Sequence, residues 1–439
     1  MQRQNVKRSV RASINDGIAW AAMSGFADTY SVPLAMAFGA STMTVGLLRS
    51  VPSLVSSAFQ MFVERLVSAV GSCKKAVMIA VGVQALSLYA AACAVFLPKG
   101  PALVFFICMI VLYTVAGNAA SPPWSVLMGE YIPASKRGSF FGFRYQLVGI
   151  SFFSAGFLAS KILGLLDNRG LWGFFTVFAA AGVLRTISFF LITRMYEPRT
   201  RFHMPRGSRV NFLDGLDFRK GRVPALFFSV LLLLLSTYLA APYFSVYALK
   251  ELNCGYSQFM VLMSIGPLMT YLLMKRWGQA ADSYGSVKIL KAAFLLIPTV
   301  PFFWSLSRNF YYLAAVEMYS GVIWGAYLIG MNNFIYETIP AHSRAGYNAF
   351  FSFTNGIAQF GGAVLGGWLY GRLPALYGSS FVFLLLISAF LRALAAVPLF
   401  LMVREVRSVR AAGPVQLLLF MSGFNTPVSL GGSVPEKVI

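Results

Sequence analysis

Two carboxylates stand inside long apolar segments of this 439-residue chain. Asp28 lies near the middle of the apolar stretch Ile14–Phe38, and Glu317 lies within the apolar stretch 311–335. A charge in hydrocarbon costs about 3 kcal/mol or more, so each needs a partner, a cavity or a route to the interface. A carboxylate at such a depth is also a natural proton carrier. Asp28 is therefore a candidate substrate or proton site, with a structural hydrogen bond or ion pair as the alternative, and Glu317 is a second candidate.

Arginines inside other apolar stretches offer partners for these carboxylates. Arg49 lies on the next apolar segment, about 6 Å nearer its outer end than Asp28 by the rise of a helix. An Asp28–Arg49 pair is one reading, and an arginine that reaches outward to the interface is the other. Arg185 and Arg392 stand late in two further segments, and we expect a structural role for both.

Uncharged polar and aromatic side chains gather on several of the same segments. Aromatic walls with a few placed polar groups suit an organic solute. Because 15% of the residues are aromatic, many rings will only pack or face lipid. Besides Asp28, Arg49 and Glu317, the candidate substrate and proton residues are Tyr30, Asn118, Gln146, Tyr238, Tyr243, Tyr319, Trp324 and Asn355.

The composition identifies the elements that must position these residues. The chain is 58% hydrophobic and only 11% charged, with a mean hydropathy of +0.69, which excludes soluble, disordered and disulfide-scaffold classes. A membrane-spanning helix takes roughly 20 apolar residues. The apolar runs predict an all-α integral membrane protein with twelve transmembrane helices at 14–38, 43–66, 76–96, 102–128, 139–163, 172–193, 223–248, 257–277, 287–306, 311–335, 346–371 and 379–403.

The placement of basic residues predicts the orientation. Most of the 36 Lys and Arg fall on one side of these helices, and the opposite side holds only Lys99, Arg169, Lys250, Arg308 and Arg372. Because cytoplasmic loops carry the excess of Lys and Arg, both termini are expected in the cytoplasm, in a bacterial cytoplasmic (inner) membrane. The same rule accounts for the net charge of +22 without a nucleic-acid partner.

An internal repeat predicts two halves. Glu130–Arg137 reads Glu-Tyr-Ile-Pro-Ala-Ser-Lys-Arg, and Glu337–Arg344 reads Glu-Thr-Ile-Pro-Ala-His-Ser-Arg. The same offset pairs Arg185 with Arg392. Such duplication is typical of transporters built from repeated bundles. The expected domains are a six-helix bundle at 1–193, a basic cytoplasmic linker at 194–222, a second six-helix bundle at 223–403 and a cytoplasmic tail at 404–439.

One segment carries a family resemblance. Residues 277–288 read Trp-Gly-Gln-Ala-Ala-Asp-Ser-Tyr-Gly-Ser-Val-Lys between the eighth and ninth predicted helices. With twelve spans and the repeat, it resembles the Gly-x-x-x-Asp-x-x-Gly loop signature of the major facilitator superfamily. The resemblance implies alternating access, with Asp282 holding the two bundles together on the inner side; a cap on the ninth helix is the alternative. The implied gating residues are Gly278, Asp282, Gly285, Lys288, Glu130, Arg137, Glu337 and Arg344.

The first half departs from this signature, since Glu64 replaces its first glycine and Ser68 its usual aspartate. Helix 5 also lacks the Gly-Pro motif of the family's drug:proton antiporters. No nucleotide-binding, protease or esterase motif occurs, so we expect neither an enzyme nor a cofactor. The leading hypothesis is a monomeric secondary transporter that moves a small organic solute through the lipid bilayer, coupled to protons. The alternatives are an exporter or flippase of amphipathic lipids or drugs, and a non-transporting membrane sensor or scaffold.

Overall fold

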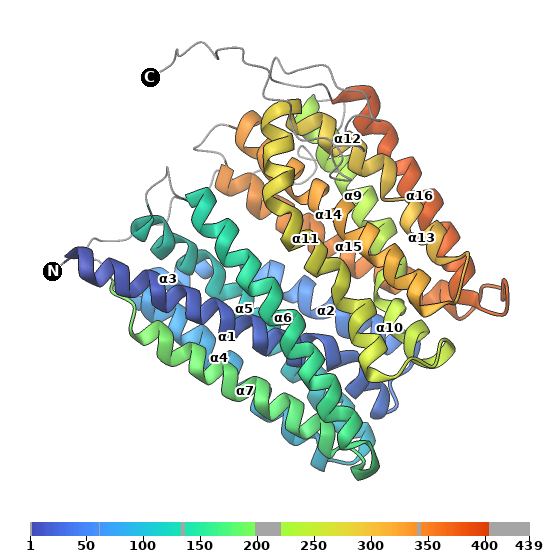
Figure 1. Ribbon diagram of the computed structural model, residues 1–439, viewed down its shortest axis with the longest axis horizontal. Helices are drawn as coiled ribbons and strands as arrows, with labels where there is room; N and C mark the ends of the chain where they lie inside the picture. Colours follow the sequence, from blue (N-terminus) through green and yellow to red (C-terminus); the bar gives the residue numbers. More distant parts are fainter. Residues whose placement is uncertain (1, 61, 133–136, 198–220, 340–343, 404–439) are drawn as a thin grey trace.

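The computed structural model describes residues 2–60, 62–132, 137–197, 221–339 and 344–403. Helices fill these ranges (Figure 1), and no β-strand occurs within them beyond an isolated bridge between Leu376 and Ser379. The structure says nothing of most of the expected linker at 194–222 or of the expected tail at 404–439, because residues 198–220 and 404–439 lie outside the described residues.

The described residues of the first half form six long helices and three short ones. The long helices are α1 (Gln2–Ala37), α2 (Thr42–Gln60), α4 (Cys73–Cys93), α5 (Lys99–Tyr131), α6 (Arg137–Leu165) and α7 (Trp172–Thr193). The short ones are α3 (Val63–Val70) before α4, the 3-10 turn η1 (Ala94–Phe96) after it and the 3-10 turn η3 (Asp167–Arg169) between α6 and α7. The first helix begins at Gln2 and not at residue 14, so Asp16 lies well inside it. The expected second helix, 43–66, is divided in two: α2 ends at Gln60, and α3 begins at Val63.

The second half repeats this plan with more interruptions. Its helices are α9 (Arg222–Ala240), η5 (Ala241–Tyr243), α10 (Phe244–Val246), the π-helical turn η6 (Tyr247–Glu251), α11 (Tyr256–Tyr284), α12 (Ser286–Leu296), α13 (Thr299–Trp304), α14 (Phe310–Thr338), α15 (Arg344–Tyr370) and α16 (Ser380–Met402). Pro298 stands at the break between α12 and α13, because proline cannot donate the helical hydrogen bond.

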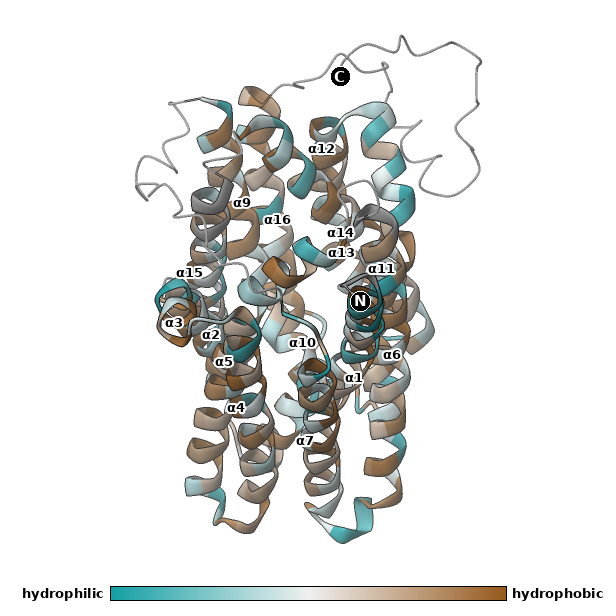
Figure 2. Cartoon of the chain, turned by 90° about the vertical axis from the view of Figure 1, so that its left-hand side faces the viewer, coloured by the Kyte–Doolittle hydropathy of each residue, from teal (hydrophilic) through white to brown (hydrophobic). Residues whose placement is uncertain are grey.

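Hydropathy marks most of these helices as membrane-spanning. Within the described ranges, nine helical segments are long and apolar enough to cross a bilayer. The long helices α1, α2 and α15 are not among those nine, but each of the twelve expected stretches falls on one helix or on consecutive helical segments. Hydrophobic colour covers much of the helical surface, while hydrophilic colour marks helix ends and turns (Figure 2). Leu86, for example, is 70% exposed on α4, as a lipid-facing side chain would be.

Three buried cores occur among the described residues. One contains only residues from Ala225 onward, and another contains only residues up to Met195. The third joins the halves, because it packs Val246, Phe259 and Met260 against α1 and other helices of the first half. Contact between the halves runs mainly through α2 with α15 and α6 with α11. The close contacts of α15 with α2 lie at Gly356, beside Ser57, and at Gly367, beside Met43. Figure 1 shows the helices of the two halves diverging toward the ends at which α1 begins and α16 ends.

Candidate functional site

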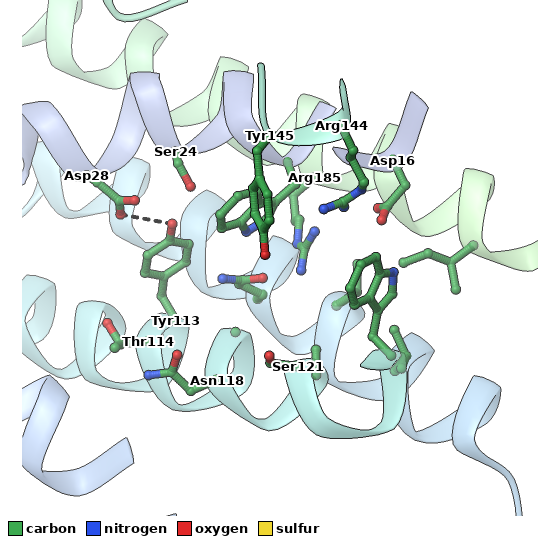
Figure 3. Close-up of a pocket in the computed structure, with 18 residues that line it drawn as sticks. Asp16, Ser24, Asp28, Tyr113, Thr114, Asn118, Ser121, Arg144, Tyr145 and Arg185 are labelled. Atoms are coloured by element: carbon green, nitrogen blue, oxygen red, sulfur yellow. Dashed lines mark hydrogen bonds between the residues drawn. The ribbon is translucent and has the colours of Figure 1, made fainter. Parts of the chain in front are cut away.

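A cavity of about 380 Å³ lies among α1, α4, α5, α6 and α7, all from the first half (Figure 3). Trp20 and Tyr145 on its wall are 37% and 38% exposed, so the cavity is not sealed. Its volume falls within the range of small-molecule pockets. The lining residues are Asp16, Trp20, Ser24, Asp28, Val77, Val81, Gln84, Tyr113, Thr114, Gly117, Asn118, Ala120, Ser121, Trp124, Arg144, Tyr145, Arg185 and Ile192.

Asp28 stands at one end of the cavity and is held by α5. The hydroxyl of Tyr113 donates a hydrogen bond to Asp28 Oδ1 at 2.9 Å (Figure 3). Ser24, one helical turn earlier on α1, lies beside them, and Arg49 of α2 acts on the carboxylate electrostatically. The nearest bonding partner of Asp28 is therefore Tyr113, while Arg49 contributes charge at longer range.

A second carboxylate, Asp16, lies near the other end of the cavity and is tied to α7. Ser188 donates a hydrogen bond to Asp16 Oδ1 at 2.6 Å and accepts one from Arg185 Nη1 at 2.8 Å. Asp16 and Arg185 are 5% and 4% exposed. Because a buried charge is stable only when compensated, this chain of contacts holds both ions in place.

Arg144 reaches the same end from α6. Its guanidinium lies over the ring of Trp124, 4.4 Å from the ring centroid, and its Nε donates to the carbonyl of Ser13 at 3.4 Å. Gly17 makes this approach possible, because a Cβ there would lie 2.8 Å from Arg144 Nη2. Arg144 and Arg185 thus both flank Asp16, as Figure 3 shows.

Amide side chains from α4 and α5 complete the wall. Asn118 donates a hydrogen bond to Ser56 of α2 at 2.7 Å. Gln84 is buried against Gly117, where a Cβ would lie 2.5 Å from Gln84 Nε2. The arrangement offers fixed polar groups between two charged ends, which is how a small site orients its ligand.

The comparisons with known proteins agree with this architecture. A family model described as Major Facilitator Superfamily matches residues 12–358, most of the chain. The chain belongs to the major facilitator superfamily. It is accordingly a multi-pass integral membrane protein with a transporter fold.

Several solved structures share this superfamily fold. The nucleoside transporter NupG is 15% identical, with a TM-score of 0.64 over 90% of this chain and 98% of that chain. A bacterial homologue of the iron transporter ferroportin, in an inward-facing state, is 12% identical, with a TM-score of 0.68 over 90% and 98%. A D-xylose-proton symporter is 13% identical, with a TM-score of 0.66 over 91% and 97%. At such identities the likeness shows the fold alone. No curated protein matches the chain significantly.

Among the residues predicted to bind substrate or protons, Asp28 and Asn118 line the cavity. The hydroxyl of Tyr30 donates to the carbonyl of Gly156 at 2.8 Å, and that of Tyr243 donates to the carbonyl of Ala363 at 2.5 Å. Both rings are fully buried. These two tyrosines therefore join helices, and they do not line the cavity.

The remaining predicted residues lie outside the cavity wall. Tyr319 bonds Thr299 at 2.9 Å, and Trp324 packs edge-on against Tyr327. Tyr238 and Asn355 share a side-chain hydrogen bond. Gln146 follows the cavity residue Tyr145 on α6 but is not part of the wall.

Glu317 belongs to a separate polar cluster in the second half. Its Oε1 accepts a hydrogen bond from Trp304 Nε1 at 2.8 Å, and Arg392 of α16 acts on it electrostatically. Arg392 is 4% exposed and donates from Nε to Ser388 at 3.1 Å. The second carboxylate candidate thus sits within a packed cluster away from the cavity.

The superfamily signature takes a different local form than expected. Helix α11 continues to Tyr284, so Gly278 and Asp282 lie on its last two turns and not in a loop. Gly285 alone separates the helices, with a φ of +95° that favours glycine. Gly285 is also the N-cap of α12, without a side-chain cap, so the structure does not support Asp282 as a cap. Asp282 is exposed.

The other gating candidates lie close to this signature or at the ends of other helices. Glu337 at the end of α14 accepts a hydrogen bond from Ser286 at 3.0 Å, and Lys288 lies one turn into α12. Glu130 is exposed near the end of α5. Arg137 and Arg344 begin α6 and α15, and their side chains lie outside the described residues.

Sequence reasoning missed several cavity residues: Asp16, Gln84, Tyr113, Trp124, Arg144 and, as a cavity residue, Arg185. One signal could have found part of this set. Asp16, Trp20, Ser24 and Asp28 recur every four residues, which places them on one face of α1. A first helix that begins at residue 14 places Asp16 in its first turn, near the interface, where a charged side chain needs no buried partner.

Proposed function

We propose that this protein is a secondary transporter that moves a small polar organic solute by alternating access, coupled to protons, with the cavity as its solute site. The superfamily fold and the size of the cavity support a transported solute over a scaffold. Four charged side chains on the wall (Asp16, Asp28, Arg144 and Arg185) favour a polar solute over an amphipathic lipid.

One observation carries the proton coupling: Asp28 faces the cavity from the interior of a membrane helix, with one oxygen bound by Tyr113. We infer that this carboxylate gains or loses a proton as the solute binds. Arg49 and Ser24 are the other groups that face this carboxylate. A proton carrier must exchange protons with a water-filled path, and the partly open cavity supplies one.

The orientation follows from the basic residues. If both termini are cytoplasmic, the ends at which the helices diverge in Figure 1 face the cytoplasm. The conformation is then the inward-open one, with the outer side closed by α2 against α15. The proposed setting is a bacterial cytoplasmic membrane.

The substitution Asp28→Asn tests the coupling. A carboxamide retains an acceptor for Tyr113 but holds no exchangeable charge. The solute that most stabilises the purified protein in a metabolite panel serves as the probe. We expect the variant to exchange this solute across proteoliposome membranes at a near-normal rate, and to lose accumulation driven by a pH gradient.

The control is Asp167→Asn, since Asp167 is exposed in the short turn η3 and its substitution should leave accumulation intact. A structural role for Asp28 predicts another result: expression and thermal stability would fall together, and Arg49→Gln would partly restore them. Full stability combined with full gradient-driven uptake in Asp28→Asn would refute Asp28 as the proton carrier.

A further inference from the structure

Three buried polar atoms on cavity-lining side chains have no hydrogen-bond partner among the described residues. They are the Nε of Arg185, the Nε1 of Trp124 and the Oε1 of Gln84, and each atom is buried. Arg185 and Gln84 are only 4% and 3% exposed as residues. Buried polar groups are nearly always paired, by protein, water or ligand. Two of these three atoms are donors on residues that line the cavity, so this part of the wall has hydrogen-bonding capacity that the protein itself leaves unused.

Positive charges outnumber negative charges at the end of the cavity where Asp16 lies. Arg144 and Arg185 are both cations, and Asp16 is the carboxylate that they flank. Asp16 already accepts the hydroxyl of Ser188, and Arg144 makes only a long contact of 3.4 Å with a carbonyl. One positive charge therefore stays uncompensated beside the cavity, in surroundings where an anion would interact strongly.

We propose that an oxyanion of the transported solute binds here, between Arg144 and Arg185, so that the substrate class is a small organic anion. This inference rests on the proposed function of the cavity as the solute site. The Trp124 ring packs against the Arg144 guanidinium and restricts its position, with Cζ 4.4 Å from the ring centroid. A guanidinium held in this way can offer parallel hydrogen bonds to an oxyanion. The rings of Trp20 and Tyr145 would contact the apolar part of the solute.

The two ends of the cavity then have complementary tasks. The anion compensates the arginine pair at one end, while a proton on Asp28 neutralises the other end (Figure 3). Movement of an anion together with a proton carries no net charge across the low-dielectric core, which avoids the cost of exposing an isolated ion there.

The test measures the charge preference of the cavity with a reporter that needs no known substrate. Ser121 is exposed on the cavity wall, one turn before Trp124. Ser121→Cys is made after replacing Cys73, Cys93, Cys108 and Cys254 by serine. The introduced thiol reacts with an anionic sulfonatoethyl or a cationic trimethylammonium-ethyl methanethiosulfonate. The reference is the anion-to-cation rate ratio of 2-mercaptoethanol, an uncharged free thiol, in the same buffer with an uncharged detergent.

We expect this ratio in the folded protein to exceed the reference by about tenfold, because a unit charge within several ångströms acts at low effective dielectric. Arg144→Gln should remove most of the excess, and Arg144→Lys, which keeps the charge, should preserve it. Arg372→Gln is the matched control: Arg372 stacks over Trp368 at 4.5 Å but lies outside the cavity. If Arg144→Gln fails to fold, Arg185→Gln supplies the same comparison.

A second measurement distinguishes the binding of an anion in the cavity from the electrostatic attraction of a charged reagent. Benzoate and benzamide have the same shape, and only benzoate is an oxyanion. We expect benzoate to raise the thermal midpoint more than benzamide does, with the difference lost in Arg144→Gln and kept in Arg372→Gln. Equal shifts, including none, would overturn the inference.

The outcomes also distinguish the two proposals. A thiol that reacts readily without any preference for the anionic reagent overturns the anion class but leaves the cavity accessible to a neutral or cationic solute. A thiol that reacts with neither reagent overturns both, since the cavity would admit no solute.

Discussion

Arg185 and Arg392 are related by the internal repeat, but the structure gives them different surroundings. Each is 4% exposed, bonds a serine on its own helix and lies near a carboxylate from another helix. Arg185 faces the cavity with Asp16, whereas Arg392 lies with Glu317 in the packed cluster of the second half. The internal repeat places an arginine at equivalent positions in the two halves, and the helices packed around each arginine determine its surroundings.

Glu317→Gln tests the structural role of the second cluster. The carboxamide keeps an acceptor for Trp304 but leaves Arg392 without its compensating charge. We expect a loss of about 3 kcal/mol of stability, because removing one member of a buried charge pair strands the other. The thermal midpoint in detergent measures it, and adding Arg392→Gln should recover part of the loss. An unchanged midpoint together with lost uptake would instead make Glu317 a transport residue.

At the scale of the helices, the close approach of α1 and α6 fixes the cavity. A Cβ on Gly25 would lie 2.4 Å from the Phe152 carbonyl oxygen and 2.9 Å from the Gly156 nitrogen, both backbone atoms. Tyr30 fastens the same pair of helices through the Gly156 carbonyl. Small residues let backbones meet in this way in membrane bundles. Since Asp16 and Arg144 stand on these two helices, their spacing depends on this contact.

Gly25→Ala should therefore destabilise the first half. Backbone cannot move aside as a flexible side chain can, so α6 must shift outward, at a cost of about 1–3 kcal/mol. The matched control is Gly164→Ala on α6, where a Cβ meets nothing within 4 Å. Thermal midpoints of the two variants, compared with wild type, check the prediction. A Gly25→Ala midpoint as high as that of Gly164→Ala would mean that the helices can separate freely.

At the scale of the whole molecule, the signature at the end of α11 is predicted to act as a gate. Asp282 is exposed, on the side where the helices of the two halves diverge. If Asp282 clamps the halves in the opposite conformation, Asp282→Asn should increase the inward-open population. The labelling rate at the Ser121→Cys thiol from the cytoplasmic side should then rise, with normal expression. Ser283→Ala serves as the neighbouring control, and equal labelling of both variants would exclude a clamp at Asp282.

The sequence by itself determined the membrane class, the position of nearly every helix, the repeat and the family resemblance, and it singled out Asp28. These properties follow from hydropathy, charge and short motifs, which act over a few helical turns. The helix limits were less exact where polar residues extend a helix into the interface, as at Gln2 for α1 and Tyr284 for α11.

The tertiary structure alone decided which polar residues meet. Ser188 bonds Asp16 across 172 residues, and Tyr30 bonds Gly156 across 126. No local pattern encodes such contacts, because they depend on how far each helix is rotated about its axis when it packs. The rotation of each helix places Tyr30 and Tyr243 in contacts between helices. It also brings Asp16, Arg144 and Arg185 together beside the cavity.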